Sequence, residues 1–171
     1  MERLWSPWRL AYVTSASTPG SGECIFCAAA AAAPGEAPLV IARGRHTFVI
    51  LNLFPYNNGH LMVVPNRHIA SLAAATPEEL AELMELTRDA EIALGEAYQP
   101  HGINVGVNLG RAAGAGIVDH IHVHLVPRWI GDTNFMSAVA ETRVLPETLD
   151  QTVARLRPIF VRLLDDQRRG R

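Results

Sequence analysis

Short hydrophobic runs, some alternating with polar residues, recur along much of the chain and are typical of β-strands. The runs cover residues 38–43, 46–52, 60–65, 102–108 and 120–127. Only Gly44 and Arg45 separate the first two runs, which predicts a hairpin. Because the strands do not alternate regularly with helices, we expect an α+β fold with an antiparallel sheet of about five strands.

Two segments carry the helical period instead. Thr76, Pro77 and Glu79 combine an N-cap, a favoured first helical residue and the partner of a capping box. A long helix should follow, and its core-facing residues are expected to be Leu80, Leu83, Met84, Thr87, Ala90 and Leu94. A second amphipathic helix is expected over residues 146–166, where Pro158 should kink or divide it.

Composition excludes several kinds of chemistry. All 15 basic residues are arginines, so no lysine is available for a Walker phosphate loop, a Schiff base or nucleotidylation on an amine. The net charge of −2 gives no overall basic field for nucleic acid or an anionic membrane. No apolar stretch approaches the ~18 residues of a membrane span. We therefore expect a cytoplasmic protein with neither nucleic-acid nor membrane partners.

Three histidines, His120, His122 and His124, alternate with apolar residues. On a strand, residues two apart share one side and lie roughly 7 Å from each other. The three imidazoles should therefore line one face, while the intervening residues pack on the other. A strand that merely exposes its histidines is the plain alternative, but strict alternation within an apolar run argues against it.

Two kinds of chemistry can use such a strand. A metal-dependent oxygenase or hydrolase would take the His-x-His pair as ligands, but residues 125–130 lack the further acidic or histidine ligands that such sites add. Phosphorus chemistry would use a neutral imidazole as nucleophile and a neighbouring protonated one to stabilise a phosphoryl oxygen or to protonate the leaving group. The glycine-rich segment 110–116 supplies backbone N–H groups for phosphate oxygens. The sequence therefore favours phosphorus chemistry.

Residues 120–126, His-Ile-His-Val-His-Leu-Val, resemble the signature of the histidine triad (HIT) family of nucleotide hydrolases and transferases. Further matches to the family are Leu51-Asn52, His60 within residues 59–65, residues 106–108, Ala113-Gly114 and Pro127-Arg128. The chain also resembles a bacterial branch of this family, described as diadenosine tetraphosphate phosphorylases or hydrolases. The segments that carry this resemblance are Cys24-Ile-Phe-Cys27 and residues 65–68, 128–129 and 131–136. The similarity runs from about residue 5 to residue 149 and implies a HIT-like fold with one long helix and a C-terminal helix.

The resemblance implies a covalent reaction in two steps. His122 attacks the α-phosphorus to form a nucleotidyl-imidazole, and water or inorganic phosphate then releases the nucleotide. His124 and His60 are expected to contact the phosphates, and Asn52 is expected to hold the ribose hydroxyls. The residues expected on the phosphate side are Asn108, Gly114, Ala115 and Gly116.

Two features bear on this assignment. The family's phosphate-contacting glutamine is missing from the segment around Ala115 and Gly116, so backbone amides would have to replace it. The third histidine is kept, which favours hydrolysis or phosphorolysis of a dinucleoside polyphosphate over sugar-phosphate transfer. A nucleoside phosphoramidate hydrolase and a nucleotide-binding module without turnover are the alternatives.

Cys24 and Cys27 have the spacing of a metal half-site or a redox pair. The resemblance to bacterial relatives implies that Cys24, Cys27, His68 and His120 form a complete structural zinc site. Ordinary free thiols are the alternative. The resemblance also implies a homodimer. We expect residues 1–37 to be an N-terminal extension, residues 38–136 the HIT core, and residues 137–171 a C-terminal extension with its helix.

Overall fold

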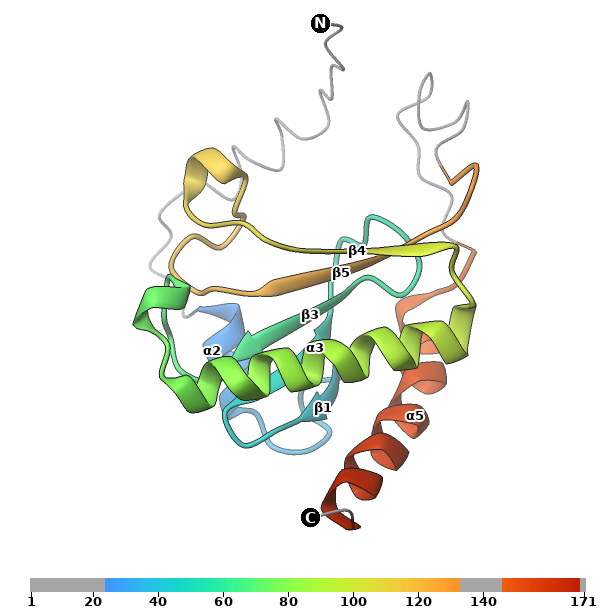
Figure 1. The fold of residues 1–171 in the computed structure, drawn as a ribbon, viewed down its shortest axis with the longest axis horizontal. Helices are drawn as coiled ribbons and strands as arrows, with labels where there is room; N and C mark the ends of the chain where they lie inside the picture. The colour runs from blue at the N-terminus through green and yellow to red at the C-terminus, as the bar shows by residue number, and fades with distance from the viewer. Residues whose placement is uncertain (1–23, 133–145, 170–171) are drawn as a thin grey trace, which may run out of the picture.

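The computed structural model describes residues 24–132 and 146–169, which form one antiparallel sheet with helices on both faces (Figure 1). The five strands in this part of the chain are β1 (Val40–Arg43), β2 (Thr47–Leu51), β3 (Leu61–Pro65), β4 (Gly102–Val107) and β5 (Val123–Arg128). Their spatial order is β1-β2-β3-β5-β4. The predicted α+β fold class is confirmed, whereas the tryptophan-containing segment before residue 24 and the motif residues 133–136 lie outside the described residues.

The long helix α3 (Pro77–Tyr98) begins as predicted. The Thr76 hydroxyl accepts a hydrogen bond from the Glu79 amide, and the Glu79 carboxylate accepts one from the Thr76 amide. The apolar and small residues buried on its inner face are Leu83, Leu86, Thr87, Ala90, Ala93 and Leu94. The expectation for Met84 was wrong, because its side chain is 60% exposed. Met84 lies about 100° around the helix from Leu83, which takes it off the buried stripe.

The second long helix, α5 (Leu149–Arg169), begins and ends three residues later than expected and is not divided by Pro158. Pro158 lies on the exposed side of the helix, where water can take the place of the lost backbone hydrogen bond. The buried side carries Val153, Leu156 and Phe160 into the main core. The segment expected as a C-terminal extension thus contributes directly to the folded core.

Glu82 on α3 holds the β1–β2 turn in place, and the sequence pattern did not indicate this contact. Its carboxylate accepts hydrogen bonds from the amides of Arg45 (2.7 Å) and Thr47 (2.6 Å) and from the amide of His46. A Cβ on Gly44 would lie 2.8 Å from the same carboxylate, so a side chain at Gly44 would push against Glu82. The predicted hairpin is therefore tied to the helix above it.

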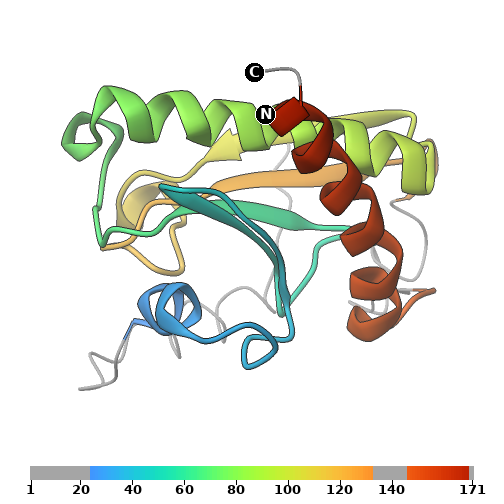
Figure 2. The same ribbon diagram turned by 90° about the horizontal axis from the view of Figure 1, so that it is seen from below.

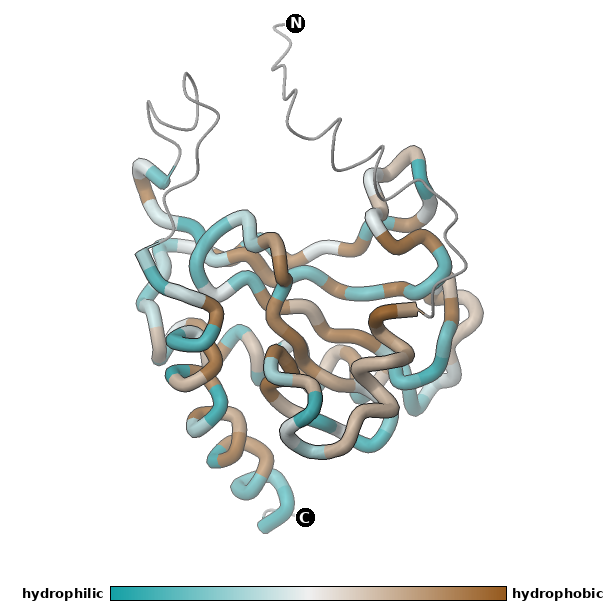
Figure 3. Tube along the Cα trace, turned by 180° about the vertical axis from the view of Figure 1, so that it is seen from behind, coloured by the Kyte–Doolittle hydropathy of each residue, from teal (hydrophilic) through white to brown (hydrophobic). Residues whose placement is uncertain are grey.

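The sheet separates two hydrophobic cores. The larger one lies between the sheet and the helices α3 and α5. The smaller one packs against the short helix α2 (Ile25–Ala31), which lies on the face of the sheet opposite to α3 (Figure 2). Hydrophobic residues are concentrated in the central strands, while α5 alternates between hydrophobic and hydrophilic residues (Figure 3). Two short 3-10 helices, η1 (Leu72–Ala74) and η2 (Arg111–Ala113), complete the described elements. Within the described ranges, no helix combines the length and apolarity needed to cross a membrane.

Candidate active site

The histidines gather on the face of the sheet that α2 covers. His124 is paired in register with Met62, a residue of the smaller core, while its neighbours Val123 and Leu125 belong to the larger core. The strand expected from residue 120 begins only at Val123, so His120 and His122 precede it. The rings of His122 and His124 nevertheless lie side by side, with their centroids 4.7 Å apart.

One hydrogen bond determines which nitrogen of His122 carries its proton. Nδ1 of His122 lies 2.9 Å from the backbone carbonyl oxygen of His120. Because a carbonyl oxygen only accepts, Nδ1 is the protonated nitrogen and Nε2 keeps its lone pair. Burial lowers the pKa of His122, which favours the neutral ring at pH 7. His122 therefore has a neutral imidazole whose Nε2 carries a lone pair, as a nucleophile requires.

A second chain of hydrogen bonds passes through His60 to His124. The amide of Tyr56 donates to Nδ1 of His60 (3.1 Å), so this nitrogen is unprotonated. The proton of the neutral ring is then on Nε2, which donates to Nδ1 of His124 over 3.0 Å. By the same reasoning, His124 carries its proton on Nε2, which makes no hydrogen bond among the described residues. His124 therefore offers a hydrogen-bond donor beside His122.

This donor is uncharged. Burial, with a smaller effect from His122, lowers the pKa of His124 to about 4. A neutral N–H can stabilise a phosphoryl oxygen by hydrogen bonding, but at pH 7 it does not supply a fixed positive charge. The site therefore places a neutral imidazole with a free lone pair, His122, beside a neutral hydrogen-bond donor, His124.

The segment between β2 and β3 orients His60. Asn52 has its amide nitrogen 3.3 Å from Nδ1 of His60, and its carbonyl oxygen accepts from the Phe54 amide (3.0 Å). The Tyr56 ring lies 4.8 Å from the His60 ring. Gly59 has φ +73°, and a Cβ there would lie 2.9 Å from Leu94 and Tyr98, so glycine is required immediately before His60.

The residues expected on the phosphate side lie at the adjacent end of β4. Asn108 directly follows Val107, which is paired with Val123, and His122 directly precedes Val123. Asn108 donates a long hydrogen bond of 3.5 Å to the Gly114 carbonyl, while Ala115 and Gly116 are half-buried. The structure thus brings this loop to the strand end beside His122, and the binding role of its residues stays a prediction.

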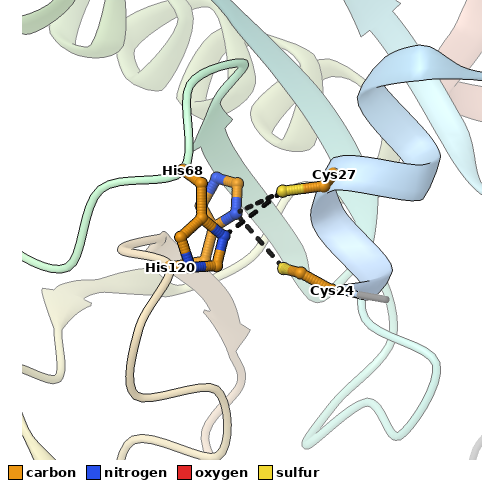
Figure 4. A group of neighbouring side chains, drawn as sticks. All are labelled: Cys24, Cys27, His68 and His120. Atoms are coloured by element: carbon orange, nitrogen blue, oxygen red, sulfur yellow. Dashed lines mark hydrogen bonds between the residues drawn. The ribbon is translucent and has the colours of Figure 1, made fainter. Parts of the chain in front are cut away.

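Cys24, Cys27, His68 and His120 meet at the start of α2 (Figure 4). Sγ of Cys24 lies 3.3 Å from Nδ1 of His120, and Sγ of Cys27 lies 3.2 Å from Nδ1 of His68. The four potential ligand atoms all lie within 4.8 Å of one another. The fold therefore brings His68 and His120, which lie more than forty residues further along the chain, next to the two cysteines, as the resemblance implied.

The donor set fits a tetrahedral zinc ion. Zinc bound to two sulfurs and two nitrogens sets its ligand atoms about 3.3–3.8 Å apart. The contacts between sulfur and imidazole nitrogen are 3.2, 3.3 and 3.6 Å. Nε2 of His120 donates to the Pro65 carbonyl (2.9 Å), which leaves the lone pair of Nδ1 facing the thiols. Metal-binding histidines commonly donate their second ring nitrogen to a carbonyl in this way.

Two contacts of the site were missed by the sequence reasoning. Phe26 packs its ring against both His120 and His122, and Tyr56 covers His60. Tyr56 stands in a turn-rich segment, where an aromatic residue close to a candidate catalytic histidine was an available signal. Phe26 lies inside the Cys-x-x-Cys motif, but only the tertiary structure shows which histidine its ring meets.

Comparisons of the sequence and of the structure with known proteins indicate the same family. The sequence pattern of the HIT domain matches residues 36–129. The chain is 42% identical over 159 residues to a Mycobacterium tuberculosis protein named AP-4-A phosphorylase, with 89% of this chain and 80% of that protein covered.

The fold agrees with that match. A crystal structure of a zinc-bound histidine triad family protein from Mycobacterium smegmatis has a TM-score of 0.66 and 31% identity, covering 86% of this chain and 99% of that one. A hypothetical histidine triad nucleotide-binding protein from Sulfolobus tokodaii has a similar fold, with a TM-score of 0.65 and 24% identity, covering 82% of this chain and 93% of that one.

The neutral state of His124 can be tested by histidine ¹⁵N NMR. With its pKa lowered to about 4, His124 should stay neutral and protonated on Nε2 throughout the range from about pH 5 to 7, because protonation sets in only as the pH falls toward the lowered pKa. The signal is assigned by its loss in His124→Asn. A midpoint near the ordinary histidine value would contradict the assignment of a neutral donor.

Proposed function

The chain is an enzyme of the HIT domain family, and on that premise we propose that it cleaves dinucleoside polyphosphates by phosphorolysis through a nucleotidyl intermediate on His122. We choose this substrate and this reaction because the chain is similar, over 89% of its length, to a protein named AP-4-A phosphorylase. The lone pair on Nε2 of His122 supports the proposed intermediate, because it supplies a nucleophile that needs no separate base.

In the first step, Nε2 of His122 attacks the α-phosphorus of diadenosine tetraphosphate. A P–N bond forms, the P–O bond to the rest of the molecule breaks, and ATP leaves. In the second step, an oxygen of inorganic phosphate attacks the same phosphorus, the P–N bond breaks, and ADP is released. Water in place of phosphate would give AMP. Because Nδ1 keeps its proton, the nucleotidylated ring is positively charged, and the carbonyl oxygen of His120 partly offsets this charge.

The surrounding residues act on the phosphates. Nε2–H of His124 donates to a phosphoryl oxygen, and His60 holds the His124 ring in the tautomer that permits this. When the substrate binds, Asn52 gives up its hydrogen bonds to His60 and Phe54 and holds the ribose hydroxyls instead. Asn108 and the backbone amides of Gly114, Ala115 and Gly116 bind the phosphates, in place of the side chain that this segment lacks.

Incubation with diadenosine tetraphosphate, with and without inorganic phosphate, tests the reaction. We expect ADP and ATP in equal amounts only when phosphate is present, resolved by chromatography. His122→Ala should lower kcat by about a thousandfold or more, because it removes the nucleophile, while the dissociation constant for a non-cleavable analogue changes little.

His46→Ala is the matched control, because its ring takes no part in the site. AMP and ATP formed without phosphate would show hydrolysis instead of phosphorolysis. Near-normal turnover by His122→Ala, or no labelled nucleotidyl-protein after rapid alkaline quenching of the wild type, would refute the covalent route.

We further propose that Cys24, Cys27, His68 and His120 hold a structural zinc ion. The donor set, the spacing of its atoms and the second hydrogen bond of His120 support this. Zinc would neutralise the two thiolates and hold α2 against the segments that carry His68 and His120. Reduced thiols also suit the cytoplasmic location that the sequence led us to expect.

Metal analysis of protein purified without chelator should give about one zinc per chain, because all four ligands come from one chain. Cys27→Ser should lose most of the zinc and lower the Tm, while His46→Ala should keep both. Zinc-free wild-type protein with an unchanged Tm on chelator treatment would rule out a structural zinc site.

A homodimer through the outer edge of β4 is the third proposal. The opposite edge of the sheet is covered, because the Arg157 guanidinium on α5 donates to the carbonyls of Pro38 (2.9 Å) and Val40 (2.8 Å). In the described chain, no strand pairs with the outer side of β4, and Val105 on it is 51% exposed. An open strand edge with apolar side chains is a surface for pairing with a second copy.

Light scattering should give about twice the chain mass of 18.6 kDa for the wild type. Val105→Lys should shift the protein toward the monomer, because a charge on an edge strand opposes pairing. Val161→Lys, at a residue with similar exposure on α5, should remain dimeric. A monomeric wild type, or a dimer unaffected by Val105→Lys, would contradict pairing through β4.

A further inference from the structure

We propose that Phe26 is a positioning residue for this reaction, and that its ring forms the wall that holds His122 in the orientation for attack. The inference rests on the proposed role of His122 as nucleophile. It gives the Cys-x-x-Cys motif a second use, since one of the two residues between the potential metal ligands packs against the reacting side chain.

Phe26 is firmly placed. Its side chain is 1% exposed and belongs to the smaller core, together with Val40, Phe48, Met62 and Val64. Cys24 and Cys27 on either side of it face the His68–His120 pair. The ring is therefore fixed by packing against the sheet and by the contacts of the two nearby cysteines.

The Phe26 ring contacts two histidines with different proposed roles. His120 belongs to the cysteine cluster, and His122 belongs to the proposed nucleotide site. Its centroid lies 5.4 Å from that of His120, edge-on at 75°, and 5.0 Å from that of His122, tilted at 52°. Both distances fall in the range of favourable aromatic pairs. A ring that packs on His122 in this way restricts the rotation of the imidazole.

The hydrogen bond to the His120 carbonyl is not enough to orient His122. It selects the protonated nitrogen, but it still allows the ring to tilt about the Nδ1–O direction. His124 lies on one side of the imidazole at 4.7 Å and 76°, and Phe26 provides a second ring contact. Together the two rings limit the direction in which Nε2 points.

Direction matters because the attack on phosphorus is in line with the leaving group. A misplacement of about 1 Å can cost a hundredfold in rate without changing the chemical groups present. Loss of the Phe26 ring should therefore appear in kcat. KM should change little, because Phe26 is buried in the core and has no surface with which to bind the nucleotide.

The test compares Phe26→Ala and Phe26→Leu with Ile25→Ala. Ile25 is the preceding residue of the same helix and is 64% exposed, so its substitution changes α2 without touching the histidines. The measurements are kcat and KM for diadenosine tetraphosphate, zinc content, Tm, and the exchange with water of the Nδ1 proton of His122 in histidine ¹⁵N NMR.

For Phe26→Ala we expect kcat to fall roughly tenfold to a hundredfold with KM within about twofold, and the Nδ1 proton to exchange faster. Phe26→Leu keeps an apolar side chain and should show a smaller effect in the same direction, and it decides the question if Phe26→Ala does not fold. Ile25→Ala should match the wild type.

Wild-type kcat and wild-type proton exchange in a folded Phe26 variant would overturn the proposal. So would a fall in kcat/KM that comes from KM alone, because that would indicate substrate contact. If the wild-type protein does not cleave the substrate, the proposed function fails. The exchange of the His122 proton then still decides whether Phe26 orients this ring.

Discussion

His120 is held at the end of β3 by the hydrogen bond from its Nε2 to the carbonyl oxygen of Pro65, and both halves of the site depend on this contact. The bond turns Nδ1 toward Cys24 and Cys27. It also anchors the residue whose own carbonyl oxygen accepts the Nδ1 proton of His122. One buried residue thus completes the cysteine cluster with its side chain and fixes the tautomer of the candidate nucleophile with its backbone carbonyl.

Burial determines the charge of the site. A fully exposed imidazole would be partly protonated near pH 7, and a protonated His122 would have no lone pair with which to attack. Placing the histidines between the sheet and α2 lowers the pKa values of His120, His122 and His124 together. The same burial requires a partner for each ring nitrogen that faces the protein, and backbone groups of His120, Pro65 and Tyr56 supply three of them.

Much of the fold could be predicted from local patterns. The hairpin, the five strands and the capped start of α3 follow from alternation, turn residues and the Thr76–Glu79 pair, because these signals act over a few neighbouring residues. The errors have two origins. For Met84 and the undivided α5, the outcome depends on which side of a helix meets the core, and the helical period alone leaves that orientation imprecise. The late start of β5 depends on distant segments, because the Ile121 amide donates to the Ile69 carbonyl and pairing with β3 begins only at Val123.

The amino-acid sequence alone specifies the chemistry that this protein has available: no lysine, three alternating histidines, and a cysteine pair with the spacing of half a metal site. It also determined the family, because residue identity at those positions carries the resemblance. Only the tertiary structure decided which imidazole nitrogen is protonated, that Glu82 closes the β1–β2 turn, and that Phe26 lies against His122. The physical reason is that hydrogen-bond partners and ring contacts are set by distances between segments far apart in the chain, which no local pattern encodes.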